Sequence, residues 1–300
     1  ILTHRILLDL RNPITLVDAT VYVSASIGIA LSPDDGTTAD ALLHNADTAM
    51  YEAKKCGRDR HMYFAPSMNA IADDRASIRH ELGEAFRNKD FELHYQPIVD
   101  VSTGRVTMLE ALVRWRRNGV VVPAQEFIDH ATQTGHLRAL GKIVLTLLDA
   151  DLNLLEGELG GTRPQVAANF SGIELDERDV IDRLITWAPP GGFDKLVIEV
   201  TESALLDEHG RARDTLGILK RFGAKISIDD FGTGYSNLEL LDRLEPDVIK
   251  IDRSLLQRAS SHPRGRAILD AAVRLAKALD ARTVVEGVES QQIWDYVCTL

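Results

Sequence analysis

Two aspartates, Asp229 and Asp230, stand side by side where a β-branched run ends in a loop punctuated by glycines. Ile226 and Ile228 alternate with other residues just before them, a pattern typical of a β-strand. Two adjacent carboxylates repel each other, and a pair of divalent cations would stabilise them because such ions prefer hard oxygen ligands. A helix N-cap or an Asx turn is the alternative, since turns also use aspartate. The pair therefore predicts either a metal site at a strand tip or a local turn.

Other residues able to bind metal or phosphate stand at or near the ends of further predicted strands. They are Glu110, Asn169, Glu199, Lys250 and Glu286. With Asp229 included, the successive intervals are 59, 30, 30, 21 and 36 residues. A βα unit of an eight-fold barrel averages roughly 30 residues, so each side chain is expected on a different, consecutive strand. The carboxyl ends of barrel strands converge on one mouth, and we therefore expect these side chains to gather there.

The residue types suit phosphoryl chemistry. Carboxylates and a carboxamide can hold Mg²⁺ or Mn²⁺, whereas no Cys/His cluster suggests structural zinc. Arg114 lies four residues after Glu110, so strand alternation puts both on one face, where a guanidinium can fork a phosphate. Lys250 could orient or deprotonate a water, and two metals about 4 Å apart can activate the attacking oxygen and stabilise the leaving one. A metal-assisted enolising enzyme is an alternative, because such sites also set lysine beside carboxylates on Mg²⁺.

Strand-like and helix-like runs alternate from Phe91 onward. The predicted strands are Phe91–Val99, Val106–Val113, Val166–Phe170, Leu196–Val200, Lys225–Ile228, Val248–Ile251 and Thr283–Val285. The predicted helices cover about 136–157, 174–187, 204–222 and 264–279. This alternation indicates an α/β fold with a largely parallel sheet. Only Asp100–Arg105 separates the first two strands, which is too short for a parallel crossover, so these two should be antiparallel.

Composition limits the kinds of partner. The chain has 300 residues, 45% hydrophobic and 26% charged, with a net charge of −11, which argues against a nucleic-acid polymer or an anionic membrane as a general partner. Two cysteines without metal-type spacing favour a reducing, cytoplasmic compartment. No apolar run reaches membrane-spanning length. Because Ile1 and Leu300 both fall inside apparent helices, we expect a fragment of a larger protein, whose upstream part could be membrane-anchored.

The first 66 residues form a separate small segment. A β-branched run over 14–31, a helix with an apolar face from Leu42 to Ala53, and a short strand at His61–Phe64 are expected there. Gly57 is the expected helix stop. About 65 residues make a small core, which fits a truncated domain. The next helix, 67–88, is interpreted as a joining helix, with an ordinary surface helix of the second domain as the alternative.

With these segments defined, most of the chain resembles the EAL-domain phosphodiesterases of cyclic di-GMP. The resemblance rests on Tyr95-Gln-Pro-Ile-Val99, Glu110-Ala-Leu-Val-Arg114, Asn169-Phe-Ser171, Glu199-Val-Thr-Glu202, Asp229-Asp-Phe-Gly-Thr-Gly234, Ile249-Lys-Ile-Asp252 and Glu286-Gly-Val-Glu289. Several independent motifs in one order make this signal specific. It implies a TIM-like (β/α)8 barrel with an antiparallel first strand pair. The family's last strand is not reached by Leu300, so we expect a barrel that lacks it, with open edges and reduced stability or activity.

The first segment resembles the C-terminal half of a GGDEF domain, an α+β remnant here. The match lies in Ser26-Ile-Gly-Ile-Ala30 and in Ala46-Asp-Thr-Ala-Met-Tyr-Glu-Ala-Lys54 through Arg58, and the signature GG(D/E)EF is absent. The resemblance therefore implies no diguanylate cyclase activity in this chain. The predicted organisation is 1–66 as GGDEF remnant, 67–88 as inter-domain helix and 89–300 as EAL barrel.

Carried over by motif, the EAL resemblance implies two Mg²⁺ or Mn²⁺ ions, with Asp229 as the bridge between them. The implied metal ligands are Glu110, Asn169, Glu199, Asp229 and Asp230. Lys250 would position the attacking water, and Glu286 would hold a ligand water or a metal. Glu202 would support the Phe231–Ser236 loop.

For the substrate, the resemblance implies that Arg114 grips a phosphate and that Gln96 and Pro123 line the nucleotide pocket. Leu112 would contribute mainly through its backbone and packing. The implied activity is hydrolysis of cyclic di-GMP to linear pGpG, with a homodimer through the EAL domain. A non-catalytic receptor that binds cyclic di-GMP and signals through the joining helix is the alternative function, because a fold alone does not define an activity.

Overall fold

A computed structural model describes residues 2–10, 14–15, 20–21, 23–55, 59–159, 164–176, 179–188, 193–205, 211–233 and 238–300. The chain divides into two compact units, Ile1–Glu84 and Ala85–Leu300. Helix α3 (Pro66–Asn88) continues from the first unit into the second. The expected helix stop at Gly57 and the last residues of the Phe231–Ser236 loop lie outside the described ranges.

The first unit is built from short elements. They are α1 (Leu2–Leu10), β1 (Ile14–Thr15), β2 (Thr20–Val21), β3 (Ile27–Ile29), α2 (Ala39–Lys55) and β4 (His61–Tyr63). β1 pairs with β2 antiparallel, and β3 pairs with β4 parallel. β3 and α2 approach closely at Gly28, where a Cβ atom would lie 1.8 Å from the carbonyl oxygen of Ala46. The helix and the short strand that the sequence predicts here are both present.

Helix α3 confirms the helix expected over 67–88. Ile78, Leu82 and Ala85, at steps of four and three residues, are 1–2% exposed. Two aromatic contacts involve its last turn, since the Phe86 ring lies 5.0 Å from Phe91 and 4.8 Å from His136. This turn is therefore packed onto the first strand of the second unit.

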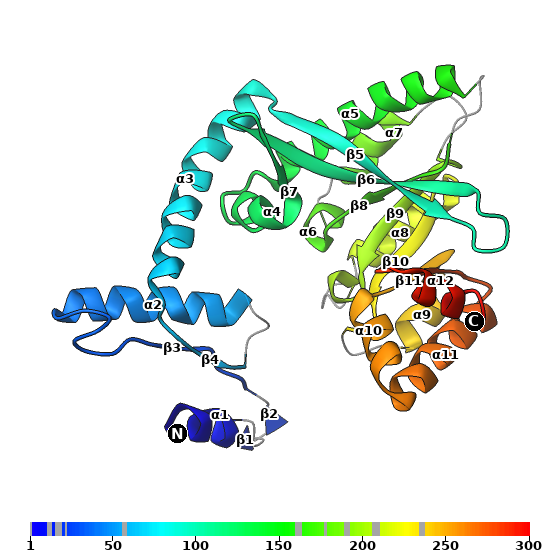
Figure 1. Cartoon of the computed structure of the whole chain (residues 1–300). Helices are drawn as coiled ribbons and strands as arrows, with labels where there is room; N and C mark the ends of the chain where they lie inside the picture. The colour runs from blue at the N-terminus through cyan, green and yellow to red at the C-terminus, as the bar shows by residue number, and fades with distance from the viewer. Residues whose placement is uncertain are drawn as a thin grey trace. The chain divides into compact units, whose positions relative to one another are not determined.

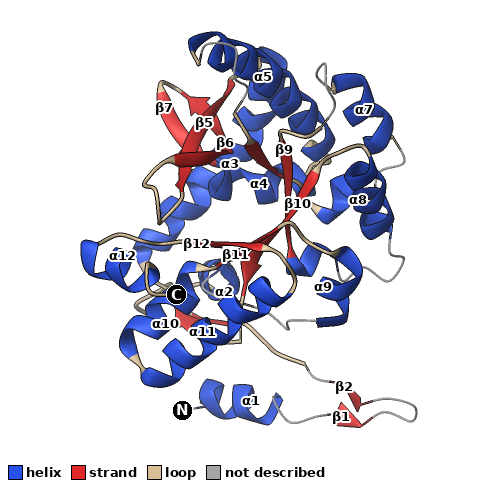
Figure 2. Cartoon of the chain, turned by 90° about the vertical axis from the view of Figure 1, so that its right-hand side faces the viewer, coloured by secondary structure: helices blue, strands red, loops and turns tan. Residues whose placement is uncertain are grey.

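The second unit contains one curled mixed sheet (Figures 1 and 2). Its strand order is β12-β11-β10-β9-β8-β6-β5, and β7 pairs with β6 outside this path. The strands are β5 (Phe91–Val99), β6 (Val106–Arg117), β7 (Val120–Pro123), β8 (Val166–Asn169), β9 (Leu196–Thr201), β10 (Lys225–Phe231), β11 (Val248–Ile251) and β12 (Arg282–Val285).

The strand pairing agrees with the sequence prediction. β5 and β6 are antiparallel, whereas β6, β8, β9, β10, β11 and β12 pair parallel in turn. Among the described residues, β5 and β12 each have a single neighbour in the sheet. The sheet is therefore a barrel that stays open between these strands, as expected for an EAL barrel without its last strand. The hairpin strand β7 was not predicted, although Asn118 and Gly119, with φ of +49° and +83°, form the two-residue Asn-Gly turn that is a strong hairpin signal.

Helices cover the outer face of this sheet. They are α4 (Ala124–Gln133), α5 (Leu137–Glu158), α6 (Gly172–Leu175), α7 (Val180–Trp187), the 3-10 turn η1 (Glu202–Leu205), α8 (Arg211–Arg221), α9 (Leu238–Leu244), α10 (Arg253–Ser261), α11 (Pro263–Ala278) and α12 (Gln291–Val297). The stretch predicted as one helix over 174–187 is divided, since α6 ends at Leu175 with Asp176 at its C-cap position and α7 begins at Val180.

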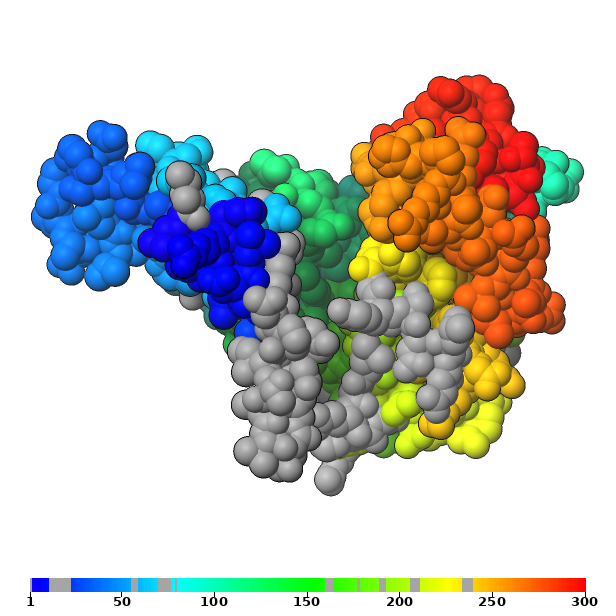
Figure 3. Space-filling model, turned by 90° about the horizontal axis from the view of Figure 1, so that it is seen from below, coloured from blue at the N-terminus to red at the C-terminus, as the bar shows by residue number. Residues whose placement is uncertain are grey.

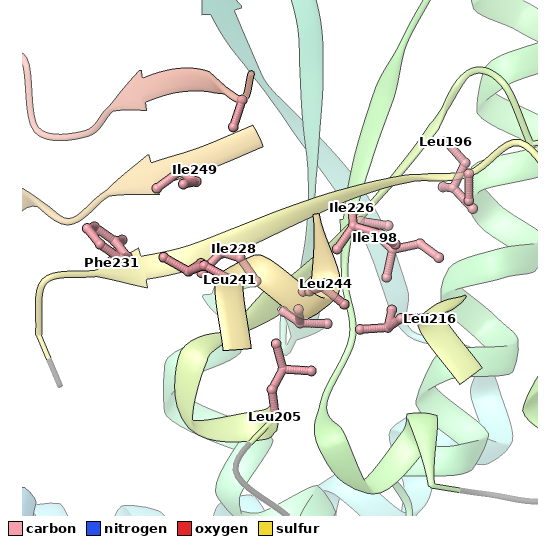
Figure 4. Close-up of a cluster of buried hydrophobic side chains, with 14 of the residues drawn as sticks. Leu196, Ile198, Leu205, Leu216, Ile226, Ile228, Phe231, Leu241, Leu244 and Ile249 are labelled. Atoms are coloured by element: carbon pink, nitrogen blue, oxygen red, sulfur yellow. The ribbon is translucent and has the colours of Figure 1, made fainter. Parts of the chain in front are cut away.

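The main core lies between the sheet and these helices. Alternate residues of the central strands point into it: Ile198 of β9, Ile226 and Ile228 of β10, and Ile249 of β11. Figure 4 shows Ile226 and Ile228 close to the leucines of the covering helices. Since neighbouring strand residues face opposite sides, the residues between these isoleucines must line the inner face of the barrel.

The last three helices pack together at one face of the second unit (Figure 3). The guanidinium of Arg266 on α11 lies 5.4 Å from the ring centre of Tyr296 on α12, and Lys277 Nζ donates a 2.8 Å hydrogen bond to the carbonyl of Leu300. Among the described helices of both units, none combines the length and the apolar character needed to cross a membrane.

Candidate metal centre

The predicted site residues come from the inner face of the sheet at its carboxyl edge. Ala168, Ile198, Ile228, Ile249 and Ile251 point into the outer core. Their strand neighbours therefore point inward, and these are Asn169, Glu199, Asp229 and Lys250. On β6, Glu110 precedes the core residue Ala111 and pairs with Gln96 of β5. Alternation along separate strands thus collects these side chains in one place.

Lys250 is the centre of this cluster. Its side chain is 2% exposed, and its Nζ atom contacts four carboxylates. The distances are 3.1 Å to Glu110, 3.1 Å to Glu199, 3.2 Å to Asp229 and 2.9 Å to Glu286. Asn169 adds a 3.2 Å hydrogen bond from Nδ2 to Glu110 Oε1. Five strands therefore supply groups to one buried polar network.

The adjacent aspartates occupy a β-bulge. β10 pairs Ile228 with Ile249 and then Phe231 with Ile251, so the register shifts across Asp229 and Asp230. Asp230 has a φ of +56°, and its amide donates a 2.9 Å hydrogen bond to Asp229 Oδ1. Neither residue is a helix N-cap, because α9 begins only at Leu238. The bulge directs Asp229 to Lys250 and leaves Asp230 beside it at the cavity.

The charges of the network are unbalanced, and the acid pKa values reflect this. Burial, and then repulsion from Glu110 and Asp229, raises the pKa of Glu199 to about 8 against the attraction of Lys250. Burial also raises the pKa of Glu286 and, together with the neighbouring Asp229, that of Asp230. Burial acts to lower the pKa of Lys250, but its carboxylate neighbours outweigh this and raise it. One ammonium therefore faces more carboxylates than it can neutralise.

The donor set fits a hard divalent cation. Ligand atoms of Glu110, Glu199 and Asp229 lie within 4.8 Å of one another. Glu199 Oε1 is buried and has no hydrogen-bond partner in the described part of the chain. Carboxylate oxygens in excess of the available positive charge are the ligands that Mg²⁺ and Mn²⁺ prefer. The cluster is thus a metal-type acidic site.

A cavity of about 1480 Å³ opens beside the cluster. From the predicted set it is lined by Gln96, Glu110, Leu112, Arg114, Asn169, Asp229, Asp230, Lys250 and Glu286. Arg114 and Glu110 therefore share the cavity face that their spacing predicted. The cavity continues along Ile98, Val284 and Trp294, which belong to β5, β12 and α12 on the two sides of the barrel opening.

Three predicted residues do not line the cavity. Glu199 lies beneath it at 0% exposure, and Glu202 is 6% exposed in η1, directly after β9. Pro123 pairs with Arg114 across the β6–β7 hairpin and precedes Ala124, which does line the cavity. The sequence roles of Glu202 and Pro123 stay predictions.

Other polar residues lie around the cavity and were not among the predicted site residues. Arg253 and Glu289 both line it and form a 3.1 Å ion pair. Ser171 and Glu174 form a capping box that fixes the turn after Asn169. The spacing Ser-x-x-Glu is a recognisable signal for such a cap, and Glu289 stands within a motif already quoted, so the sequence contained both signals.

An open α/β barrel with an acidic, lysine-centred site at its strand ends defines a class of barrel proteins whose site residues fit a metal ion. Among known families, the EAL domain matches residues 79–300, and the family described as diguanylate cyclase, GGDEF domain, matches residues 2–60. The chain belongs to the EAL domain family, preceded by part of a GGDEF domain. Both resemblances inferred from the motifs are thereby confirmed.

Relatives and solved structures agree with this assignment. Cyclic di-GMP phosphodiesterase NbdA of Pseudomonas aeruginosa is 36% identical over 296 residues, 97% of this chain and 38% of that protein. Cyclic di-GMP phosphodiesterase PdeR of Escherichia coli is 34% identical over 292 residues, 96% of this chain and 44% of that protein. The chain thus spans about two fifths of these relatives.

Among solved structures, that of the PaMucR phosphodiesterase in complex with c-di-GMP matches with a TM-score of 0.68 at 30% identity. The match covers 74% of this chain and 91% of that one. The fold of the second unit is therefore that of an EAL domain.

Proposed function

We propose that the protein containing this chain hydrolyses cyclic di-GMP to linear pGpG at the acidic cluster, with two Mg²⁺ or Mn²⁺ ions. The observation that carries the proposal is Lys250 held among four carboxylates on the wall of a cavity that also contains Arg114. The names of the relatives NbdA and PdeR support the same substrate.

In this proposal the metals would be held by Glu110, Asn169, Glu199, Asp229 and Asp230, with Asp229 between the two ions. When bound, two such ions lower the pKa of a water and stabilise negative charge on a phosphodiester. Lys250, fixed by its carboxylates, would orient the attacking water, and Glu286 would hold a ligand water or a metal. Glu202 supports the loop that begins at Phe231.

Substrate contacts would come from the other cavity residues. Arg114 donates to a phosphate oxygen, which suits a planar guanidinium. Gln96 and Pro123 contact the nucleotide, and Leu112 shapes the wall by its backbone and packing. The attacking water adds to phosphorus, one P–O ester bond breaks, and the released ribose oxygen takes up a proton. The first unit contributes no diguanylate cyclase activity in this proposal.

The organisation of the protein is also proposed. Residues 1–66 would be the GGDEF remnant, 67–88 an inter-domain helix and 89–300 the EAL barrel. The EAL barrel would form a homodimer in a cytoplasmic compartment, because two cysteines without metal-type spacing favour reducing conditions.

The test is turnover of cyclic di-GMP by the protein extended past Leu300, in Mn²⁺ or Mg²⁺, with pGpG measured by chromatography. Glu110→Ala should abolish turnover because it removes a ligand and one partner of Lys250. Glu158→Ala, an exposed acid at the end of α5, is the matched control and should leave the rate unchanged. An inert protein, or a Glu110→Ala variant of normal rate, would overturn the proposal.

Two outcomes would identify the alternatives. A thermal shift with cyclic di-GMP in Mn²⁺, without any hydrolysis, would indicate a receptor, because a ligand specific for the folded state raises its stability by mass action. Absence of any shift would favour a different substrate of a metal-dependent barrel, such as an enolisable acid.

A further inference from the structure

The chain turns sharply directly after the two site aspartates. Asp230 has a φ of +56° and Gly232 one of +97°, both in the left-handed region. That region costs a residue with a Cβ atom some strain, less for aspartate than for most residues, so contacts with the surrounding structure help to maintain it. The amide and hydroxyl of Thr233 donate to the carbonyl of Asp230, at 3.2 and 2.9 Å. These bonds close the turn, and the pairing of Phe231 with Ile251 fixes its first half to the sheet, but neither attaches Gly232 and Thr233 to the barrel.

Helix α10 supplies the attachment. Arg258 Nη2 donates a 3.2 Å hydrogen bond to the carbonyl oxygen of Gly232. Leu255, one turn earlier on the same helix, lies directly against Gly232, where an added Cβ atom would be 3.0 Å from Leu255 Cδ2. At the start of the helix, the amide of Asp252 donates to the carbonyl of Phe231 at 3.3 Å. The turn is thus in contact with α10 at three successive points.

Arg258 is itself held in place. Its carbonyl accepts from the amide of His262 at 3.0 Å, and α11 packs so closely that a Cβ atom on Gly265 would lie 2.3 Å from that carbonyl oxygen. The Arg258 Nε atom also donates to the carbonyl of Ser254 at 3.3 Å. The backbone of Arg258 is therefore held by the packing of α10 against α11, and its bond to Ser254 directs the guanidinium along α10 toward the turn.

The side chain of Arg258 does not reach the metal-type cluster. It lines a separate hollow with Thr233, Ser254 and Gln257, and it is absent from the residues that line the cavity of Lys250. Any effect of Arg258 on the reaction must therefore pass through the backbone of the turn.

We infer that Arg258 is a positioning residue for the Asp230 carboxylate: its hydrogen bond to Gly232 holds the left-handed turn that presents Asp230 to the metal centre. The inference rests on the proposed function, in which Asp230 is a metal ligand. Without the guanidinium, the carbonyl of Gly232 turns to water, and the turn samples conformations in which Asp230 is misplaced. Metal affinity then falls although every ligand is still present.

The experiment measures Mn²⁺ binding to the intact chain by titration calorimetry, without substrate. Arg258→Ala should weaken binding at one Mn²⁺ site by about tenfold, the factor expected for one lost hydrogen bond from a charged donor. Arg258→Lys, which keeps a donor and the charge, should recover part of the affinity. The melting temperature of both variants should stay close to that of the parent.

Arg264→Ala is the matched control, since Arg264 is exposed on α11 and its side chain makes no hydrogen bond or ion pair with the described residues. It removes the same charge and should leave Mn²⁺ binding unchanged. Equal Mn²⁺ affinity of Arg258→Ala and the parent would overturn the inference alone. Equal weakening by Arg264→Ala would also overturn it, because a general charge effect would then explain the result. A parent chain that binds no Mn²⁺ would overturn the proposed function and this inference together.

Discussion

At the scale of single residues, the site depends on one lysine that compensates several acids. Lys250 is 1% exposed, and its Nζ atom contacts carboxylates from four other positions. A buried charge is stable only with partners, and removing one partner is more costly than replacing all of them. The cluster is therefore sensitive both to substitution and to pH.

Lys250→Met should destabilise the metal-free protein by about 3 kcal/mol, because the acids lose the one ammonium that contacts them in the described part of the chain. Mn²⁺ should restore much of the loss, since the cation replaces the missing charge. Urea unfolding with and without Mn²⁺ measures both effects. Lys142→Met on the exposed face of α5 is the control and should change stability little. Unchanged metal-free stability of Lys250→Met would contradict the charge argument.

The raised pKa of Glu199 predicts that the stability of the folded state falls as pH rises. An acid whose pKa is lowered on folding has the opposite effect. Its pKa is about 8 when folded, against 4.5 for the exposed group, so the folded state binds the extra proton between these values. The extra proton contributes its full stabilisation below pH 4.5, and this stabilisation is lost as pH rises through about 8. The free energy of unfolding falls by at most about 1.4 kcal/mol per pH unit over this range. Mn²⁺ affinity should rise over the same range, because binding requires the carboxylate.

Unfolding curves of metal-free protein between pH 5 and 8.5, each repeated with Mn²⁺, check the pH prediction. Glu199→Gln, which cannot ionise, should flatten the metal-free dependence. A slope that persists in Glu199→Gln would assign the titration to another group.

At the scale of elements, the strand ends are held in place where the backbones of neighbouring elements approach closely. Gly172 begins α6 just after Asn169, and a Cβ atom there would lie 2.7 Å from the carbonyl oxygen of Ala204 in η1. The capping box of Ser171 and Glu174 fixes the same turn. The carboxyl end of β8 is therefore set by contacts of α6 with η1 rather than by the strand alone.

Gly172→Ala should destabilise the protein by about 1–3 kcal/mol, because backbone atoms must shift to admit the methyl group. Gly217→Ala is the control, since nothing lies within 4 Å of a Cβ atom there and α8 should gain up to about 1 kcal/mol from the better helix former. Urea midpoints of the two variants should move in opposite directions. A Gly172→Ala variant as stable as the parent would show that the backbone of η1 can shift to admit the methyl group with no loss of stability.

At the scale of the whole molecule, the chain contains two separate compact units. All three tryptophans, Trp115, Trp187 and Trp294, belong to the second. Their fluorescence therefore reports on the EAL barrel alone, whereas circular dichroism reports on both units. This difference allows the two units to be followed independently in one chain.

Gly28→Ala should destabilise the first unit by about 3 kcal/mol, because the methyl group would overlap the backbone of α2 at Ala46 and Met50. The tryptophan transition in urea should stay where it is, while part of the circular dichroism signal is lost at lower urea. A tryptophan midpoint that moves with the variant would show that the two units unfold as one cooperative body.

The sequence by itself determined the order of the strands and the types of the site residues. Strand periodicity, the spacing of βα units and the short Asp100–Arg105 connection are local properties, so they predicted the parallel sheet and its antiparallel first pair. The open barrel was implied by the resemblance to the EAL family. The short hairpin strand β7 was missed although Asn118-Gly119 signals its turn. The division between α6 and α7 escaped because helical periodicity does not mark where a helix stops.

Only the tertiary structure decided how these residues meet. Lys250 and Glu110 lie 140 residues apart, and their 3.1 Å contact depends on the register and curl of every intervening strand. Neighbouring elements also determine the bulge, which directs Asp229 and Asp230 differently, and the hydrogen bond from Arg258 to Gly232. Sequence spacing predicts which strand carries a side chain, whereas distances of a few ångströms are set by how helices and strands pack.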